Sequence, residues 1–564
     1  MRFWWILGLL AAVGIVAAAP PINDFPGIHA LDLGNRAPGA AIHPPPENDG
    51  GCRSQPQSEP RFYNSVTKGF YVNGTTLPEI KFDVGHSYAG NLPISNKRNG
   101  SDELFFWFFP TTNEEHKDDK EIVIWLSGGP GCSSMAALFL ENGPISWQPG
   151  TLEPTPYPFS WHLLTNVVWI DQPVGTGFSK GNASITDEDG LAEQFKGFWR
   201  NFVDTFGMHG WKVYIAGESY AGFYGPYIAS GFIDAKDTEY FDVQGLMIYD
   251  GLMFDQIVQA DVPILPFITR YQDILPFDDN QLSEYRGTHE DCGFAEFFDK
   301  YLVFPPSGIQ PDLNSSITDK NCVSLQDQVF DQARLANPCF NWYNIIDYCP
   351  LRYDGSGITS SFIGGNASYF NRRDVKDALH VSPSTNWAGC SVLKSVFATG
   401  DGLDHSPPPG LKQLPHVIDT TKNVILAAGG LDVVFPINGI VLGIQNMTWG
   451  KEMGFQYKPQ DPFYVPNYGI NRTDTDTTGY GSNLPASHGV LGTTHHERGL
   501  TFVATKLAGH QGPAFAPAAS FRHLEKFLGR VKSLSSTEPF TLPWLRNISQ
   551  PAGNTLGRGT MPIP

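Results

Sequence analysis

The sequence predicts an α/β fold in which helices cover both faces of a mostly parallel central sheet. Two observations support it: short continuous apolar runs recur along the chain, and amphipathic helical patterns separate them. Continuous apolar runs of this length are typical of parallel strands buried on both faces. A third observation is that residues 253–375, rich in Pro and Asp and holding four cysteines, interrupt the alternation. We therefore expect one sheet-based core with an inserted cap.

Each expected element rests on its own local pattern. The apolar runs predict strands at 104–109, 121–126, 167–171, 212–216, 245–250, 423–428 and 501–505. After the third run, apolar residues recur from Leu191 to Phe206 at spacings of three and four, which predicts an amphipathic helix. The same pattern predicts a helix at 518–527.

Composition bounds the class of protein. Of the 564 residues, 41% are hydrophobic and 13% aromatic, enough for a packed interior and too many for a disordered chain. The length exceeds the roughly 250–300 residues that one core usually serves, so we expect either two domains or one core that carries large insertions. The net charge of −19 repels phosphate backbones, so we expect no nucleic-acid partner.

The N-terminus predicts entry into the secretory pathway. Residues 1–19 combine Arg2, an apolar run and three small residues, as a signal peptide does. That run is too short to span a membrane, so no membrane anchor is expected. The Pro- and Gly-rich stretch 20–60 is interpreted as a leader or pro-segment. We expect a secreted or vacuolar glycoprotein, with glycosylation signals at Asn73, Asn99, Asn182, Asn314, Asn366, Asn446, Asn471 and Asn547.

Seven cysteines in an oxidising compartment predict disulfides and leave at least one residue unpaired, for which Cys52 is the candidate. The four cysteines of the cap allow three pairings, and these are Cys292, Cys322, Cys339 and Cys349. No cysteine pair has metal-site spacing, and His495-His496-Glu497 lacks the i, i+4 spacing of zinc-protease helices. We interpret that triplet as part of a loop and expect neither a metal nor an organic cofactor.

A candidate nucleophile follows the strand at 212–216. Ser219 lies in Gly217-Glu218-Ser219-Tyr220-Ala221-Gly222, just before a helical stretch. A sharp strand-to-helix turn lifts a serine hydroxyl out of the sheet and needs small neighbours, although Ala221 replaces the last glycine of the strict motif. An ordinary turn is the competing interpretation.

A glycine-rich loop follows the strand at 121–126. Gly128, Gly129 and Gly131 would let backbone N–H groups point into a cavity, as an oxyanion hole requires. A simple glycine turn is the alternative, and a phosphate loop is disfavoured because no Gly-Lys-Ser/Thr follows.

Two further residues complete a possible triad. Asp432 follows the strand at 423–428, and His510 follows the strand-like run 501–505. The order Ser, Asp, His, with each residue in a loop after a strand, is that of α/β-hydrolase triads.

These motifs together resemble the serine carboxypeptidases of the α/β-hydrolase fold, of fungal type. The matching stretches are WLSGGPGCSS, LENGPI, VVWIDQPVGTGFS, GESYAG, AAGGLDVVFP and AGHQGP, which occur in the family's order within residues 61–530. The resemblance implies a hydrolase core in two parts, 61–252 and 376–530, around the cap at 253–375, and a C-terminal tail at 531–564.

The resemblance also implies the roles of individual residues. Ser219 would be the nucleophile, His510 the general base and Asp432 the residue that orients it, with the N–H groups of Gly129 and Tyr220 as the oxyanion hole. The implied binders of the substrate's terminal carboxylate are Ser127, Gly128, Glu141 and Glu218. The implied disulfide joins Cys132 to Cys390.

Two positions depart from the family pattern. Ser127 stands where the family has Asn, whose amide contacts the terminal carboxylate, and Gln511 stands where Met is common. A hydroxyl reaches less far than an amide, so weaker carboxylate recognition is expected at Ser127.

The expected activity is release of C-terminal amino acids from peptides or proteins through an acyl-enzyme, with an acidic optimum because Glu141 and Glu218 cannot both ionise cheaply. The alternatives are an acyltransferase or esterase on the same fold, and a non-catalytic binding protein that kept the scaffold. A C-terminally amidated substrate distinguishes a carboxypeptidase, which should lose most of its kcat/KM on it, from an acyltransferase or esterase. Reaction with a serine-directed covalent inhibitor distinguishes an enzyme from a non-catalytic binding protein.

Overall fold

The computed structural model describes residues 60–95, 102–275, 277–313, 322–362, 368–391, 395–468, 487–546 and 548. The signal peptide, all of the leader except Pro60, and Cys52 lie outside these residues, as do the sequons at Asn99, Asn314, Asn366, Asn471 and Asn547. Among the helices of the described residues, none is long and apolar enough to cross a membrane.

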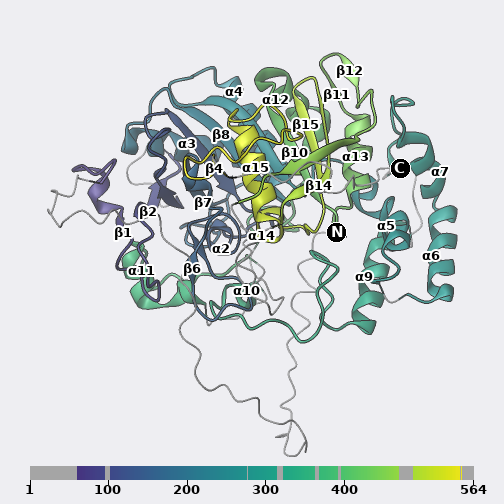
Figure 1. Ribbon diagram of the computed structural model, residues 1–564, viewed down its shortest axis with the longest axis horizontal. Helices are drawn as coiled ribbons and strands as arrows, with labels where there is room; N and C mark the ends of the chain where they lie inside the picture. The colour runs from purple at the N-terminus through teal and green to yellow at the C-terminus, as the bar shows by residue number, and fades with distance from the viewer. Residues whose placement is uncertain are drawn as a thin grey trace, which may run out of the picture.

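One large sheet forms the centre of the molecule (Figure 1). Its strands, in spatial order, are β1 (Tyr71–Asn73), β2 (His86–Pro93), β3 (Glu103–Phe109), β7 (Asn166–Asp171), β4 (Glu121–Leu126), β8 (Lys212–Glu218), β9 (Asp242–Tyr249), β10 (Val424–Gly429), β15 (Leu500–Thr505), β14 (Gly489–Glu497) and β13 (Asp461–Val465). All seven strands expected from the apolar runs are present, which confirms the α/β prediction.

Parallel pairing is confined to the middle of this sheet. The six strands from β7 to β15 pair in parallel, whereas β1, β2 and β3 on one side and β14 and β13 on the other pair antiparallel. The expectation of a mostly parallel sheet therefore holds for the central strands and not for the edges.

The sheet has an apolar cluster on each face, which is why its central strands carry continuous apolar runs. In β4, Ile122 and Ile124 belong to one cluster, while Val123 and Trp125 belong to the other. The first cluster is covered by three helices, α3 (Glu188–Phe206), α4 (Ala221–Asp234) and α12 (Gln413–Thr421). The second is covered by α2 (Ser134–Leu140) and α15 (Pro517–Phe527).

The expected helix at 191–206 is α3, and its bounds have local causes. The Asp187 side chain caps its start by accepting a hydrogen bond from the Gly190 N–H at 2.7 Å. Gly207 ends it in the left-handed conformation, with φ of 67°.

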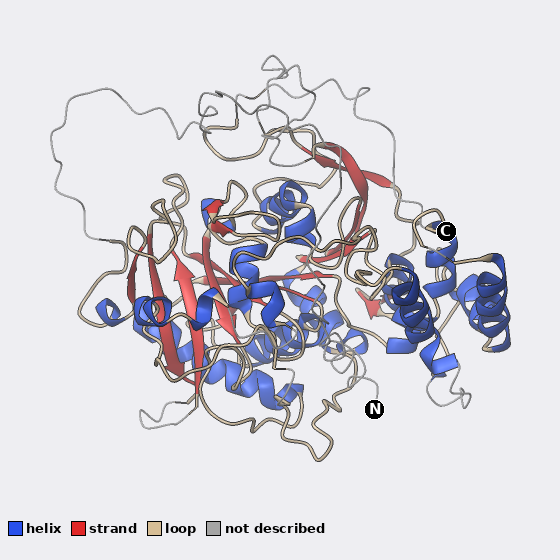
Figure 2. Ribbon diagram, turned by 90° about the horizontal axis from the view of Figure 1, so that it is seen from below, coloured by secondary structure: helices blue, strands red, loops and turns tan. Residues whose placement is uncertain are grey.

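The stretch 253–375 divides between two places. Its helices α5 (Ile264–Arg270), α6 (Asp279–Asp291), α7 (Phe294–Tyr301) and α9 (Leu325–Ala336) lie together at one end of the molecule, opposite the end where β1 lies (Figure 1). Figure 2 shows the same separation, with the grouped helices at the right and one end of the sheet at the left. After α10 (Ile358–Ser361), Tyr369 and Phe370 pack into the second cluster beside Phe139.

Three disulfides join described residues. The cysteines of the insertion pair as Cys292–Cys322 and Cys339–Cys349, one of the three pairings left open by the sequence. The third disulfide joins Cys132 to Cys390.

The remaining short elements connect these layers. They are β5 (Ile145–Ser146), β6 (Thr155–Pro156), α11 (Arg373–Ala378), α13 (Ile437–Asn446), β11 (Thr448–Trp449), β12 (Glu452–Met453) and α14 (Gly512–Phe515).

The interpretation of His495-His496-Glu497 as a loop was wrong, because these residues end strand β14. Strand alternation puts His495 and Glu497 on one face, where His495 Nε2 lies 2.7 Å from Glu497 Oε1. His496 faces the other way, and its Nδ1 lies 2.8 Å from Thr501 Oγ1. No group of three possible metal ligands occurs among the residues that the structure describes.

Candidate active site

Ser219 occupies a strained turn between β8 and α4. Its φ of 60° lies in the left-handed region, which residues with a Cβ rarely adopt. The turn is fixed on both sides, because the Ser219 N–H donates to the Tyr249 carbonyl at 2.9 Å and the Ser219 carbonyl accepts from Gly222 at 2.9 Å. A Cβ on Gly217 would lie 2.4 Å from the Leu126 carbonyl oxygen, so this neighbour has to be small.

Asp432 and His510 form a buried pair at the ends of two neighbouring strands. Asp432 follows β10 and His510 follows β15, and Asp432 Oδ2 lies 2.8 Å from His510 Nδ1. The Val434 N–H donates to Asp432 Oδ1 at 2.8 Å and holds the carboxylate in place. His510 is only 3% exposed, and its Nε2 has no hydrogen-bond partner among the described residues. The imidazole is thus oriented through Nδ1 and has its second nitrogen available.

The three residues of the expected triad share one edge of the sheet. Ser219, Asp432 and His510 follow β8, β10 and β15, and these strands belong to the parallel central set. The carboxyl ends of parallel strands meet at the same edge, which is where open α/β sheets bind ligands.

The glycine-rich loop after β4 lies directly against the serine turn. A Cβ on Gly128 would lie 2.5 Å from the Tyr220 nitrogen and 2.7 Å from the Ser219 Cβ, so only glycine fits there. Gly129 has a φ of 116°, again a conformation that favours glycine. The loop therefore lies with Gly128 against the backbone of Tyr220 and the Ser219 side chain, and the oxyanion-hole role of Gly129 and Tyr220 stays a prediction.

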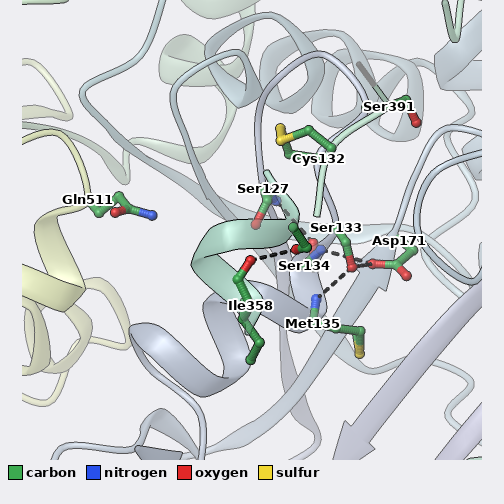
Figure 3. The surroundings of a disulfide bond; sticks show 12 residues. Ser127, Cys132, Ser133, Ser134, Met135, Asp171, Ile358, Ser391 and Gln511 are labelled. Carbon is green, nitrogen blue, oxygen red and sulfur yellow. Dashed lines mark hydrogen bonds between the residues drawn. A yellow bond between two sulfur atoms is a disulfide. The ribbon is translucent and has the colours of Figure 1, made fainter. Parts of the chain in front are cut away.

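The disulfide Cys132–Cys390 anchors this loop (Figure 3). Backbone hydrogen bonds flank it: Ser133 N–H donates to Gly389 at 2.8 Å, and Ser391 N–H donates to the Gly131 carbonyl at 2.9 Å. The glycine-rich loop is therefore held covalently and by backbone pairing to the segment around residue 390.

Glu141 and Glu218 form a buried pair of carboxyl groups beside Ser219. They are 3% and 6% exposed, and their side chains contact each other. Neither Oε2 receives a hydrogen bond from an N–H or O–H group of the described residues. Burial raises the pKa of Glu141 to about 7. Burial, and then the charge of Glu141, raise the pKa of Glu218 well above its usual range, so the pair keeps a proton at acidic pH.

Ser127 and Gln511 lie apart, with the Gln511 side chain extended toward the segment that carries Ser127 (Figure 3). The Ser127 hydroxyl accepts a hydrogen bond from Trp125 Nε1 at 3.3 Å, and the Ser127 N–H donates to Ser134 Oγ at 3.0 Å. Gln511, which follows His510, donates from Nε2 to Glu141 Oε1 at 3.4 Å.

Sequence reasoning missed a second carboxyl pair, Asp250 with Asp432. Asp250 ends the apolar run of β9 with a φ of 43°, is fully buried, and accepts a hydrogen bond from the Gly429 N–H at 2.7 Å. Burial, and then the charge of Asp432, raise the pKa of Asp250 well above its usual range. The sequence signal that could have revealed this pair is an acidic residue directly after a buried strand.

A third carboxyl pair, formed by the buried Glu188 and the half-buried Asp404, contacts Tyr220 and was also missed. The Tyr220 hydroxyl donates to Asp404 Oδ2 at 2.6 Å, and the buried Glu188 carboxyl contacts both side chains. Burial, and then the charge of Asp404, raise the pKa of Glu188 well above its usual range. No local sequence signal links these residues, because Asp404 lies far from Glu188 and Tyr220 in the sequence.

Comparison with known proteins identifies the family. Residues 78–530 match the family model described as serine carboxypeptidase. A probable serine carboxypeptidase of Arthroderma benhamiae is 43% identical over 486 residues, covering 84% of this chain and 88% of that protein. The serine-type carboxypeptidase F of Aspergillus niger is 42% identical over 491 residues, covering 85% of this chain and 90% of that protein.

A solved structure supports the fold. The prohormone-processing carboxypeptidase Kex1 of Saccharomyces cerevisiae superposes with a TM-score of 0.64 at 22% identity, covering 82% of this chain and 96% of that chain. The resemblance stated from the motifs and the α/β-hydrolase prediction are thereby confirmed. The chain belongs to the serine carboxypeptidase family.

Proposed function

We propose that this chain releases the C-terminal amino acid of peptides through an acyl-enzyme formed on Ser219. The observation that carries the proposal is the buried Asp432–His510 pair, which leaves His510 Nε2 without a partner at the sheet edge where the strained Ser219 turn ends. A serine, a base and an orienting carboxylate are what acyl transfer needs.

The reaction follows from these positions. His510 Nε2 takes the proton of the Ser219 hydroxyl while the oxygen attacks the last peptide carbonyl carbon. The N–H groups of Gly129 and Tyr220 stabilise the negative oxygen that forms. His510 then gives its proton to the departing amino group, and the peptide bond breaks. Water, deprotonated by His510, attacks the acyl-enzyme and restores the free serine.

The carboxyl pair gives this chemistry its preference for chain ends. At acidic pH, a proton on Glu141 or Glu218 allows one carboxyl group to donate a hydrogen bond to the substrate's terminal carboxylate, together with Ser127 and Gly128. When the proton leaves, like charges meet and peptide binding weakens. Because burial raises the pKa of both carboxyl groups, the pair holds its protons at acidic pH and loses them as pH rises, so we expect an acidic optimum with KM increasing as pH increases.

The decisive experiment compares an N-blocked dipeptide with its C-terminal amide at acidic and neutral pH. Fast, acid-favoured release from the free acid, with little release from the amide, is the expected result. Equal turnover of both substrates would instead favour an esterase or acyltransferase. Ser219→Ala should abolish turnover while the circular dichroism spectrum stays that of the wild type, and near-wild-type activity would overturn the assignment.

We also propose entry into the secretory pathway, with a secreted or vacuolar destination and N-linked glycans at the predicted sequons. Of the sequons described, Asn73 and Asn182 are exposed, and Asn446 is half-buried with its amide oxygen bound by the Gln310 N–H at 3.0 Å. Loss of mass on glycosidase treatment of the natural protein tests the proposal, and an unchanged mass contradicts it.

A further inference from the structure

We propose that Gln511 supplies the side-chain amide that binds the substrate's terminal carboxylate, and that it keeps part of this binding independent of pH. The inference rests on the proposed function, because it concerns the same substrate carboxylate. It adds a specificity-determining residue that the triad and the carboxyl pair do not include.

The backbone places Gln511 at the site and holds it there. It directly follows His510, whose N–H donates to the Tyr343 carbonyl at 2.7 Å. The Gln511 carbonyl accepts hydrogen bonds from Ala514 at 3.0 Å and Phe515 at 3.1 Å, which closes the turn into α14. Anchored on both sides, Gln511 has only its side chain free to move.

The amide of Gln511 is weakly engaged. Nε2 donates to Glu141 Oε1 at 3.4 Å, beyond the usual range of about 2.7–3.2 Å for such bonds. A glutamine amide carries two N–H donors, so this contact leaves donor capacity unused. In Figure 3 the amide points toward the segment that carries Ser127. A ligand between these residues would meet the amide directly.

A bound carboxylate needs more donors than Ser127 provides. A carboxylate offers about four lone-pair sites, and the Ser127 hydroxyl has one proton. That hydroxyl is already turned to Trp125, from whose indole it accepts. Gln511 is the side-chain amide that contacts the carboxyl pair, and it supplies the N–H that the short Ser127 side chain lacks.

An amide differs from the carboxyl pair in one respect: it does not titrate. The ionisable groups around it are Glu141 at the end of α2, Glu218 at the end of β8, His510 in its own loop, and Tyr157, whose hydroxyl bonds the Pro513 carbonyl at 3.3 Å. As pH rises, the carboxyl pair loses its donor proton, whereas the Gln511 N–H groups remain. Gln511 should therefore account for most of the carboxylate recognition that survives at neutral pH.

The test uses Gln511→Met, which keeps the length and removes the donor, together with Ser127→Asn and the double variant. For the free-acid dipeptide we expect Gln511→Met to raise KM about tenfold or more, the loss of one hydrogen bond to a charged group, with kcat changed by less than about threefold. The rise should be larger at neutral than at acidic pH. Ser127→Asn added to Gln511→Met should restore most of the lost affinity, because the asparagine at position 127 again supplies a side-chain amide donor for the substrate carboxylate.

Two controls separate a local effect from misfolding. Gln456→Met alters a half-buried glutamine whose amide bonds only the Met453 carbonyl, and it should leave KM unchanged. A serine-directed covalent inhibitor should react with Gln511→Met at the wild-type rate, which shows an intact triad.

The outcomes distinguish the two proposals. If the wild type prefers the free acid and Gln511→Met leaves KM unchanged at both pH values, the role of Gln511 is wrong and the carboxypeptidase proposal stands. If the wild type handles acid and amide alike, the proposed function itself fails. Failure of Ser127→Asn to restore affinity would also contradict an amide-donor role.

Discussion

Two buried carboxyl pairs belong to the candidate site, one of which includes Asp432 of the triad, and they differ in what surrounds them. In the Asp250–Asp432 pair, backbone N–H groups of Gly429 and Val434 and the His510 imidazole bind three of the four oxygens, and Asp250 Oδ2 lacks a donor among the described residues. In the Glu141–Glu218 pair, both Oε2 atoms lack a donor among the described residues, and Gln511 makes one long hydrogen bond.

The contrast shows that a pair of carboxyl groups can serve two purposes, depending on whether the chain or a ligand supplies its hydrogen-bond donors. Where the chain supplies most of the donors, including two backbone N–H groups, the pair orients an imidazole. Where donors are left out, the pair is arranged for an external ligand. Substitutions in the two pairs should therefore affect different kinetic constants.

The largest expected effect is that of Asp432→Asn. An asparagine amide can offer a donor to His510 Nδ1 where the carboxylate accepts, which favours the wrong imidazole tautomer. We expect kcat to fall on the order of 10³–10⁴-fold with KM nearly unchanged. Steady-state kinetics on the free-acid dipeptide measures it. A kcat within tenfold of the wild type would remove Asp432 from the triad.

Glu141→Gln should act on KM rather than kcat, and through pH. In the wild type, burial raises the pKa of both carboxyl groups, and once the last proton of the pair starts to leave, KM should rise by up to about tenfold per pH unit. With a neutral amide at position 141, like charges no longer meet in the pair, so KM should climb less steeply. A pH series of KM checks this, and parallel curves for variant and wild type would contradict the shared-proton account.

Asp250→Asn should have a small effect on catalysis. The raised pKa keeps Asp250 protonated, and an asparagine preserves both a donor toward Asp432 and an acceptor for the Gly429 N–H. We expect kcat within about threefold of the wild type, while Asp250→Leu, which leaves Gly429 N–H unbound, should lose more and fold less stably. A large loss in Asp250→Asn would mean that Asp250 acts in its charged form.

The smallest effect concerns stability. Folding raises the pKa of Glu188 and Asp250, so their stabilising contribution is complete below their unfolded pKa of about 4 and is lost as pH rises toward their folded pKa. Glu188→Gln should therefore match the wild-type Tm at acidic pH and exceed it by a few degrees at neutral pH. Thermal unfolding at several pH values measures this. A variant Tm below that of the wild type at neutral pH would contradict it.

The sequence predicted the parts of this molecule that depend on local pattern. The central strands carry continuous apolar runs because both faces are buried, and the sharp turn at Ser219 needs small neighbours that are visible in the chain. The edge strands were missed because they are partly exposed and mix polar residues with glycine; β14 even ends in His495-His496-Glu497.

The pairing of carboxyl groups could not be predicted in the same way. Whether Asp250 or Glu188 is buried beside a second acid depends on contacts between distant segments. Glu141 and Glu218 were identified only through family resemblance, and their roles as carboxylate binders stay a prediction. The same holds for the triad: Asp432 contacts His510, and the catalytic roles of the three residues stay a prediction.

The Cys132–Cys390 bond has a consequence for proteolytic processing. It spans 258 residues, including the whole insertion with its own two disulfides. A single cut anywhere between those two cysteines would leave both pieces in one molecule, with the glycine-rich loop still fastened to residue 390. On a denaturing gel, such a nicked enzyme would migrate as one band without reductant and as two bands with it. A cleaved, two-chain form could therefore be missed if its mass were measured only under non-reducing conditions.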